Sequence, residues 1–374
     1  MSGIILKSQL DVEDLTWGAT LLGVGGGGTP AEGHKLLSRE LAAKGSIECV
    51  DPLSLPDDAL TVCVTFMGNR APLTPEQEAQ KKTLGLTEWK YENNMVEAVR
   101  FFEKVMNRKV DALIIPELGG ANTPSPIATA SILDIKAVDA DYCGRALPEV
   151  AQSGSCLMGE SMTPIVSVDK WGNKSVIYEI VNEALGERLG KMLAVAAFGN
   201  TALALSPVPA SVMKKATVHG TVSECVGIGR CAREAKEAGR DVVEAVMAHT
   251  GAKKLFQGRL VRAEWSVKDG YLDGYNTFEG EAEFSGHTLR TWFKNENHIA
   301  WLDDKPYATS PDMICQIEYN LGRPLLNNEC KEGQSFVILG LPARDLHLQG
   351  NHLSMLDPRH YGFDIDYLPL KGRL

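Results

Sequence analysis

The sequence predicts a protein of two parts. Residues 1–170 are expected to form an α/β domain with three layers and a mostly parallel sheet, because strand patterns alternate there with helix patterns. Residues 171–374 are expected to form a helical connection followed by a β-barrel-like domain, because short strand patterns alternate with turn signals from Lys254 onward. The length of 374 residues agrees with two or three domains.

The first half opens with two predicted helices joined by a glycine-rich loop. A capping-box pattern at residues 8–11 begins a helix that should run through Leu22. Thr-Pro-Ala-Glu at residues 29–32 combines a helix cap with a proline in the first turn. The helix that it begins should run to about Ala43 and end before Gly45.

Short apolar runs and helical patterns then follow one another. The run VDALIIP at 110–116 is typical of a strand buried on both faces. The other expected strands are 47–50, 60–67 and 136–138, the expected helices are 93–106 and 128–133, and a hairpin is expected over 164–178.

The second half begins with helices, the clearest at 222–238 and 242–249. An uncharged stretch from Met192 to Met213 is long enough for a membrane span. Turn residues at 199–201 and 206–209 interrupt it, so we expect a buried helix followed by a loop, and no membrane partner.

The composition excludes several classes of function. With 38 Lys plus Arg against 48 Asp plus Glu, the net charge of −10 disfavours nucleic acids and anionic lipid surfaces as partners. The N-terminus does not resemble a signal peptide, and the eight cysteines include no CxxC pair. We therefore expect reduced thiols and a cytoplasmic location.

The glycine-rich segment at 23–29 satisfies GxGxxG, with acidic residues about 20 positions further on. That dinucleotide fingerprint needs a preceding strand, whereas residues 12–22 have a helical pattern. We therefore expect no nucleotide cofactor, and a nicotinamide-dependent oxidoreductase is disfavoured. The alternatives are an anion-binding nest at a helix start and a purely structural turn. The residues expected to contact substrate here are Gly26, Gly27, Gly28 and Thr29.

A second candidate cluster follows the buried strand at 110–116. Carboxyl ends of parallel strands border the ligand crevice of open α/β sheets. Glu117 is therefore a candidate general base or ligand contact, and a helix cap is the structural alternative. Gly119, Gly120 and Asn122 are expected to contact substrate beside it.

A third cluster follows the strand at 136–138. If the chain is extended there, Asp139 and Asp141 project to the same side and are candidate acid and base. Their carboxylates also leave a divalent metal possible. Arg145 is expected to bind a substrate carboxylate, with Glu149 as a further substrate contact. A network that caps a turn is the structural alternative.

Other reactive side chains give weaker signals. Cys143 and Cys156 are possible nucleophiles, but inert thiols are favoured because no histidine is near in sequence. The histidines show no zinc signature. Three polar segments of the second half, 294–297, 310–312 and 357–364, are turns that could overhang the crevice.

These segments together resemble a known family. The residues that carry the resemblance are Gly-Gly-Gly-Gly-Thr-Pro at 25–30, Glu-Leu-Gly-Gly-Ala-Asn at 117–122, Asp-Ala-Asp at 139–141, Gly-Arg-Ala-Leu-Pro-Glu at 144–149, Pro-Asp at 311–312 and Asp-Pro-Arg-His-Tyr-Gly-Phe-Asp at 357–364. They resemble, in order, a family long catalogued as a domain of unknown function. Its named activity is S-methyl-thiohydantoin desulfurase, and it is associated with hydantoinase and oxoprolinase systems. The family usually has Asp-Gly-Asp where this chain has Asp-Ala-Asp.

The resemblance implies an N-terminal three-layer α/β domain, a C-terminal β-barrel-like domain and a hydrolase of small-molecule catabolism, with a homo-oligomer as one expected assembly. The reaction would be attack on C2 of a thiohydantoin, with loss of methanethiol to leave a hydantoin. On this basis Asp141 or Glu117 would be the base and Asp139 the partner of a ring nitrogen. The Gly26–Thr29 amides would contact the ring carbonyl or the intermediate, and Arg145 a side-chain carboxylate.

Two alternatives stay open at this point. A hydantoinase-like amidohydrolase would open the ring and release an N-carbamoyl acid. A non-catalytic subunit of a hydantoinase or oxoprolinase complex would bind the heterocycle without turnover.

Overall fold

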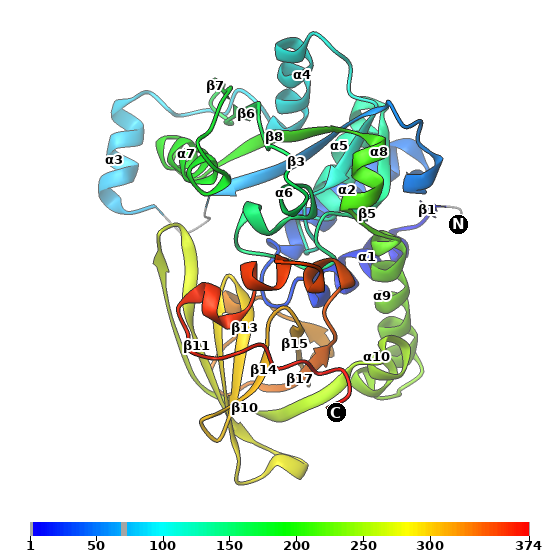
Figure 1. Ribbon diagram of the computed structural model, residues 1–374, viewed down its shortest axis with the longest axis vertical. Helices are drawn as coiled ribbons and strands as arrows, with labels where there is room; N and C mark the ends of the chain where they lie inside the picture. Colours follow the sequence, from blue (N-terminus) through cyan, green and yellow to red (C-terminus); the bar gives the residue numbers. More distant parts are fainter. Residues whose placement is uncertain (1–2, 69–72, 374) are drawn as a thin grey trace.

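The computed structural model describes residues 3–68 and 73–373 and contains two β-sheets, one in each lobe (Figure 1). The upper lobe holds the N-terminal α/β part, and the lower lobe holds the antiparallel strands of the second half. Helix α1 (Gln9–Leu22) lies between them, and its buried residues share one apolar cluster with residues from both sheets. The lobes are therefore joined by a continuous core.

The first sheet has nine strands, in the order β1-β2-β5-β4-β3-β8-β6-β7 with β9 paired to β5. Only the β2–β5, β5–β4 and β4–β3 pairs are parallel, and the other five are antiparallel. The predicted α/β fold is confirmed, but the sheet is mixed and the expectation of a mostly parallel one is wrong. The strands are β1 (Ile4–Leu6), β2 (Ile47–Val50), β3 (Leu60–Gly68), β4 (Ala112–Ile115), β5 (Lys136–Asp141), β6 (Ile165–Val168), β7 (Lys174–Ile177), β8 (Asn200–Pro209) and β9 (Val218–His219).

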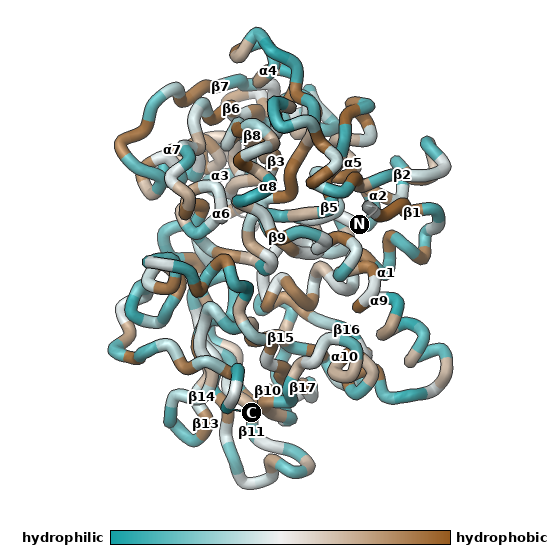
Figure 2. Tube along the Cα trace, turned by 45° about the vertical axis from the view of Figure 1, so that its right-hand side comes forward, coloured by the Kyte–Doolittle hydropathy of each residue, from teal (hydrophilic) through white to brown (hydrophobic). Residues whose placement is uncertain are grey.

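Strand β8 is the main reason for this difference. It occupies the uncharged stretch in which we expected a helix followed by a loop, and it pairs antiparallel with both β3 and β6. The residues Ser206 and Pro207, which indicated a loop, form an irregularity in the pairing with β3, and Ser206 has a φ of 50°. A bulge accommodates proline in a central strand. Figure 2 shows hydrophobic stretches along β3, β6 and β8. In the described residues no helix is long and apolar enough to cross a membrane.

The predicted helix ends agree with the structure where local capping determines them. Ser8 accepts from the Asp11 N–H in a capping box that begins α1, and α2 ends at Lys44 with Gly45 at φ 79°. The helices of the upper lobe and the connection are α2 (Pro30–Lys44), α3 (Pro75–Thr83), α4 (Asn94–Met106), α5 (Pro124–Leu133), α6 (Gly154–Leu157), α7 (Glu183–Ala196), α8 (Ala210–Ala216), α9 (Thr221–Glu237) and α10 (Val242–Thr250).

The second sheet has eight antiparallel strands, in the order β14-β13-β12-β11-β10-β17-β15-β16. The sheet is not closed, so the β-barrel-like domain that we expected is not confirmed. Strands β13 and β15 are linked by the side-chain amide of Asn297, which donates to the Ile314 carbonyl at 3.0 Å. The strands are β10 (Lys253–Lys268), β11 (Tyr271–Gly280), β12 (Thr288–Lys294), β13 (Glu296–Leu302), β14 (Lys305–Thr309), β15 (Met313–Glu318), β16 (Arg323–Pro324) and β17 (Ser335–Leu341).

Two features connect the parts across the expected boundary at residue 170. Strands β7, β8 and β9 follow that residue and still belong to the first sheet. The hairpin of β10 and β11 extends from the lower lobe and reaches α7 of the upper lobe, as Figure 1 shows at the left. The tip of this hairpin contributes to the cavity described below.

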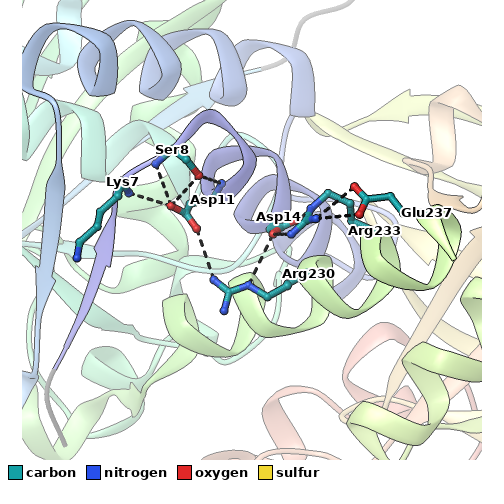
Figure 3. A network of polar contacts seen from close by, with 7 residues as sticks. All are labelled: Lys7, Ser8, Asp11, Asp14, Arg230, Arg233 and Glu237. Atoms are coloured by element: carbon teal, nitrogen blue, oxygen red, sulfur yellow. Dashed lines mark hydrogen bonds and ion pairs between the residues drawn. The ribbon is translucent and has the colours of Figure 1, made fainter.

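Helices α1 and α9 pack with their backbones in close approach. A Cβ atom on Gly18 would lie 2.0 Å from the Cys225 carbonyl oxygen, and one on Gly229 would lie 1.9 Å from the Asp14 carbonyl oxygen. Arg233 forms an ion pair with Asp14 at 2.9 Å beside this contact (Figure 3). Only glycine permits such a helix crossing, so these two positions determine how α9 lies on α1.

We predict that Gly229→Ala lowers the free energy of unfolding by about 1–3 kcal/mol, because the new methyl group overlaps the backbone of α1. Gly227→Ala is the matched control on the same helix. Its Cβ would meet only the His249 side chain, at 3.3 Å, and alanine favours the helix by roughly 1 kcal/mol. Urea unfolding of both variants tests this, and equal effects would contradict the assigned contact.

Candidate functional site

A cavity of about 150 Å³ lies where the carboxyl ends of three adjacent strands meet α7 and the β10–β11 hairpin. Strand β3 contributes its last residues, the segment after β4 contributes Pro116 and Glu117, and the segment after β5 contributes Tyr142 and Cys143. The carboxyl ends of β3, β4 and β5 therefore border a crevice, as expected for neighbouring parallel strands. A cavity of this volume is large enough for one ring of the size of benzene.

Glu117 lines this cavity with a carboxyl group that two donors hold in place. The backbone N–H of Leu147 donates to one oxygen and the side-chain amide of Asn122 to the other, each at 2.6 Å. Burial raises the pKa of Glu117 to about 8, although these two hydrogen bonds oppose the shift, and the nearby charge of Asp141 adds to it. Glu117 can therefore exchange a proton near neutral pH.

Glu149 lies on the same cavity and is ionised. Lys294 Nζ lies 2.5 Å from one of its oxygens, and His360 Nε2 lies 2.8 Å from the other. Burial favours the neutral acid, but the hydrogen bonds of His360 and Lys294 outweigh it and lower the pKa of Glu149 to about 2. Both partners come from the second half of the chain, in two of the polar segments that we expected to overhang the crevice.

A third acidic side chain, Glu187 of α7, lies at the hairpin side of the cavity. The Tyr271 hydroxyl donates to Glu187 at 2.7 Å, and the Val150 N–H donates to its other oxygen at 2.9 Å. Lys191 Nζ lies 2.9 Å from Glu187 and 3.0 Å from the centroid of the Tyr271 ring. The hairpin tip is thus fixed to α7 by a hydrogen bond and a cation–π contact, and the two α7 residues that make them are themselves paired.

Asp139 and Asp141 lie away from the cavity lining. The Asp139 carboxylate accepts from the N–H groups of Val222 and Ser223, at 2.9 and 3.0 Å, and from the Ser223 hydroxyl. These contacts cap the first turn of α9. The placement gives no support to Asp139 as an acid, a base or a contact of the substrate ring.

Asp141 stabilises the turn that leads toward Arg145. One of its oxygens accepts from the N–H groups of Cys143 and Gly144, at 2.9 and 2.7 Å. The side chain has no exposed surface, and burial raises its pKa to about 7. Its charge acts on Glu117 through the protein interior rather than on the cavity directly.

The glycine-rich loop packs behind Glu117 instead of lining the cavity. It follows helix α1, so the strand that a dinucleotide fingerprint requires is not there. Gly27 and Gly119 touch through their backbones: a Cβ on Gly27 would lie 2.4 Å from the Gly119 Cα. The Gly27 carbonyl accepts from the N–H groups of Ala121 and Asn122, at 3.1 and 3.2 Å. The loop therefore holds the 117–122 segment in position.

The other residues of this region that we expected to contact substrate contact neighbouring protein segments instead. The Gly26 N–H donates to the Gly23 carbonyl at 2.7 Å, and a Cβ on Gly28 would lie 2.8 Å from that of Ala121. Thr29 is the cap residue of α2, and a Cβ on Gly120 would lie 2.7 Å from Pro30.

Arg145 is completely buried and binds backbone carbonyls rather than a carboxylate. Its guanidinium donates to the Ala146 and Pro311 oxygens at 3.0 Å and to the Asp312 and Asn297 oxygens at 3.3 Å. It thereby links the turn after β5 to the second sheet. In this position it cannot reach a substrate in the cavity.

In the described part of the chain, neither the cysteines nor the potential metal ligands form a second candidate site. All eight cysteines lie in the described residues and are free. Burial raises the pKa of both Cys143 and Cys156, which favours the unreactive thiol form. Within residues 3–68 and 73–373, no three His, Cys, Asp or Glu side chains are grouped to hold a metal ion.

Sequence reasoning missed three residues of the site, Glu187, Lys191 and Tyr271. Glu187 and Lys191 are four apart on one helix face, which is a common pattern on solvated helices. Tyr271 follows Asp269-Gly270, which is one of the turn signals that predicted short strands in the second half. No local signal shows that this hairpin reaches α7, because the contact depends on the placement of one lobe on the other.

We predict that the free energy of unfolding of Asp141→Asn rises relative to that of the unchanged chain as pH rises from about 4 to 7. The folded pKa of about 7 lies above the unfolded value of 3.8, so in this range Asp141 ionises in the unfolded chain while it stays protonated in the folded one, and stability falls as pH rises. Asparagine keeps an oxygen for both N–H groups and carries no charge. Urea unfolding at several pH values measures the difference, and a pH-independent difference would refute it.

Comparison with known proteins agrees with this architecture. Family models of S-Me-THD-like proteins match the chain twice, the N-terminal domain over residues 10–179 and the C-terminal domain over 181–370. No curated protein matches. An X-ray crystal structure of a Chromobacterium violaceum protein, from the Northeast Structural Genomics Consortium, is similar with a TM-score of 0.76 and 22% identity. The match covers 98% of this chain and 100% of that one, and at this identity it shows the fold alone. Because the two domain models together span nearly the whole chain in order, the chain belongs to the S-Me-THD-like family.

Proposed function

We propose that this protein is a hydrolase that removes methanethiol from a small S-methyl-thiohydantoin and leaves a hydantoin. The observation that carries the proposal is the buried carboxyl group of Glu117, which the Leu147 N–H and the Asn122 amide hold at the wall of a ring-sized cavity. Burial there raises its pKa. A base with a pKa near the working pH is efficient in proton transfer. The family to which the chain belongs supports the choice of substrate.

In the proposed reaction Glu117, in its ionised form, takes a proton from water while the water oxygen bonds to C2 of the ring. The tetrahedral intermediate then breaks its C2–S bond. The proton held by Glu117 leaves with the sulfur as methanethiol. C2 keeps the new oxygen as the hydantoin carbonyl, and the remaining proton of the attacking water passes to the ring nitrogen whose double bond to C2 was opened by the attack. Glu117 ends the cycle as it began, so protons and electrons balance without a further reactant.

Glu149 is the proposed acceptor for a ring N–H. It lines the same cavity, and its low pKa keeps it ionised at neutral pH. Lys294 and His360 hold both of its oxygens, so the carboxylate can accept a further hydrogen bond without moving. This assignment replaces Asp139, whose oxygens cap α9.

The charge that develops on the ring needs donors on the cavity wall. Asn295 lines the cavity and accepts from the Leu272 N–H through its side-chain oxygen at 2.8 Å. Its side-chain amide is then the donor that we assign to the intermediate, with the Ser155 hydroxyl as a second one. These residues replace the glycine-rich loop in this role.

We predict that Glu117→Gln lowers kcat for methanethiol release by about 10²- to 10⁴-fold, which is typical of losing a general base. Glutamine can keep the hydrogen bond from Leu147 and has nearly the same volume, so the fold should be retained. Glu88→Gln, at an exposed position, is the control and should keep full activity. Thiol detection and mass spectrometry of the products measure both variants.

Near-normal turnover by Glu117→Gln would overturn the role of Glu117. Release of an N-carbamoyl acid by the unchanged chain would instead identify a ring-opening amidohydrolase. Binding without any product would identify a non-catalytic subunit.

We also predict that kcat/KM rises with pH and levels off above an inflection near 8, because only ionised Glu117 accepts the proton. Asn122→Ala removes a donor that stabilises the carboxylate, so the inflection should move to higher pH. A merely structural role of Asn122 would lower activity at all pH values without moving the inflection, and that result would count against the assignment. Thermal unfolding checks that the variant is folded.

A further inference from the structure

An open groove of about 870 Å³ lies directly beside the proposed reaction cavity. Five residues line both hollows, so the two share a wall: Gly68, Glu187, Lys191, Gly270 and Tyr271. Figure 1 shows the hairpin that carries Tyr271 reaching the side of α7 at this place. The groove therefore adjoins the cavity at the hairpin tip.

The floor of the groove is apolar and exposed. Met192 and Val195 of α7 are 51% and 61% exposed, and Val267 of the hairpin is 46% exposed. Phe198, just after α7, lines the groove between them. Apolar side chains gathered in this way beside a cavity mark a place where apolar ligand surface can be covered.

The charges of the groove balance one another. Glu187 and Lys191 are paired at 2.9 Å, and the remaining charged side chains, among the described residues that line it, are Arg188 and Asp269, one of each sign. Arg145, the cation that we expected to bind a substrate carboxylate, is bound to backbone carbonyls in the interior. An uncharged substituent therefore fits the groove better than an acidic one.

The size of the cavity makes this groove relevant to the substrate. About 150 Å³ holds a single ring, so any sizeable substituent on that ring must leave the cavity. Beyond Tyr271 the groove has room for such a substituent and an apolar surface against which it can pack. The hydrogen bond and cation–π contact that fix Tyr271 make it the residue against which the substituent must pass.

We infer that the groove along α7 is a substrate subsite that binds an alkyl or aryl substituent at C5 of the heterocycle. This inference rests on the proposed function and specifies the substrate class: thiohydantoins with an apolar side chain rather than the parent ring or an acidic derivative. The ring lies in the cavity at Glu117, and the substituent lies over Met192 and Val195.

The test compares S-methyl-thiohydantoins that carry hydrogen, methyl, isobutyl, benzyl or carboxymethyl at C5. We expect kcat/KM to rise from hydrogen to isobutyl and benzyl, by roughly threefold to fourfold for each methylene group that becomes buried. The carboxymethyl compound should gain nothing over methyl. A flat series, or the carboxymethyl compound as the best substrate, would overturn the inference.

A pair of variants tests whether the preference for apolar C5 substituents depends on the groove. Met192→Trp fills it, so the loss of kcat/KM should be at least about tenfold greater for the benzyl than for the parent compound. Leu189→Trp is the matched control: it lies on the same helix, is 41% exposed and does not line the groove. It should leave the ratio between the two compounds unchanged. Equal losses on both compounds in Met192→Trp would refute the subsite.

Two further measurements separate this inference from its alternatives. Calorimetry with the corresponding hydantoins reports binding without turnover, so a benzyl preference that Met192→Trp abolishes would support the subsite even if no methanethiol is released. Sedimentation of both variants reports the oligomeric state. If Met192→Trp changes the oligomer and not the substrate preference, the groove is an interface between copies of the chain, which contradicts the inference.

Discussion

The arrangement of the site depends on the close approach of two glycine backbones, Gly27 and Gly119. Neither position has room for a Cβ, because one on Gly119 would lie 2.3 Å from the Gly27 Cα. This contact presses the loop after α1 against the segment after β4, and the Gly27 carbonyl then accepts two N–H groups of that segment. Asn122 is thereby placed to donate to Glu117. The two glycines hold the segment of Glu117 in position through packing and do not line the cavity.

The same contact buries carboxyl groups close to one another. Glu296 of the second sheet lies against Gly26, where a Cβ would come 1.9 Å from its side-chain oxygen, and burial together with the charge of Glu117 raises the pKa of Glu296 well above its usual range. Burial is also the main reason that the pKa of Glu117 is raised. By contrast, the hydrogen bonds of His360 and Lys294 lower the pKa of Glu149, which stays ionised. Environments that push pKa values apart divide acid–base roles among carboxylates, and here they distinguish Glu117 from Glu149.

Local signals in the sequence predicted local structure well. The caps at Ser8 and Gly45 and the buried strand β4 follow from patterns within a few residues. Strand β8 did not, because its pairing with β3 is decided by residues about 140 positions away. The predicted pairing of two acidic side chains also depended on a distant segment. Asp139 and Asp141 read as a pair in sequence, yet Asp139 is occupied by the start of α9, some 80 residues later. Glu117 was identified by the general rule that strand ends border a crevice.

The central claim is that the reaction takes place in the cavity at Glu117, which both lobes complete. A crystal structure of the protein with a hydantoin bound tests it most directly. The account predicts density for the ring inside the cavity, with a ring atom within hydrogen-bond distance of the Glu149 carboxylate and C2 facing Glu117. A ring bound instead against Asp139 and Asp141 at the start of α9, or on the glycine-rich loop, would contradict it.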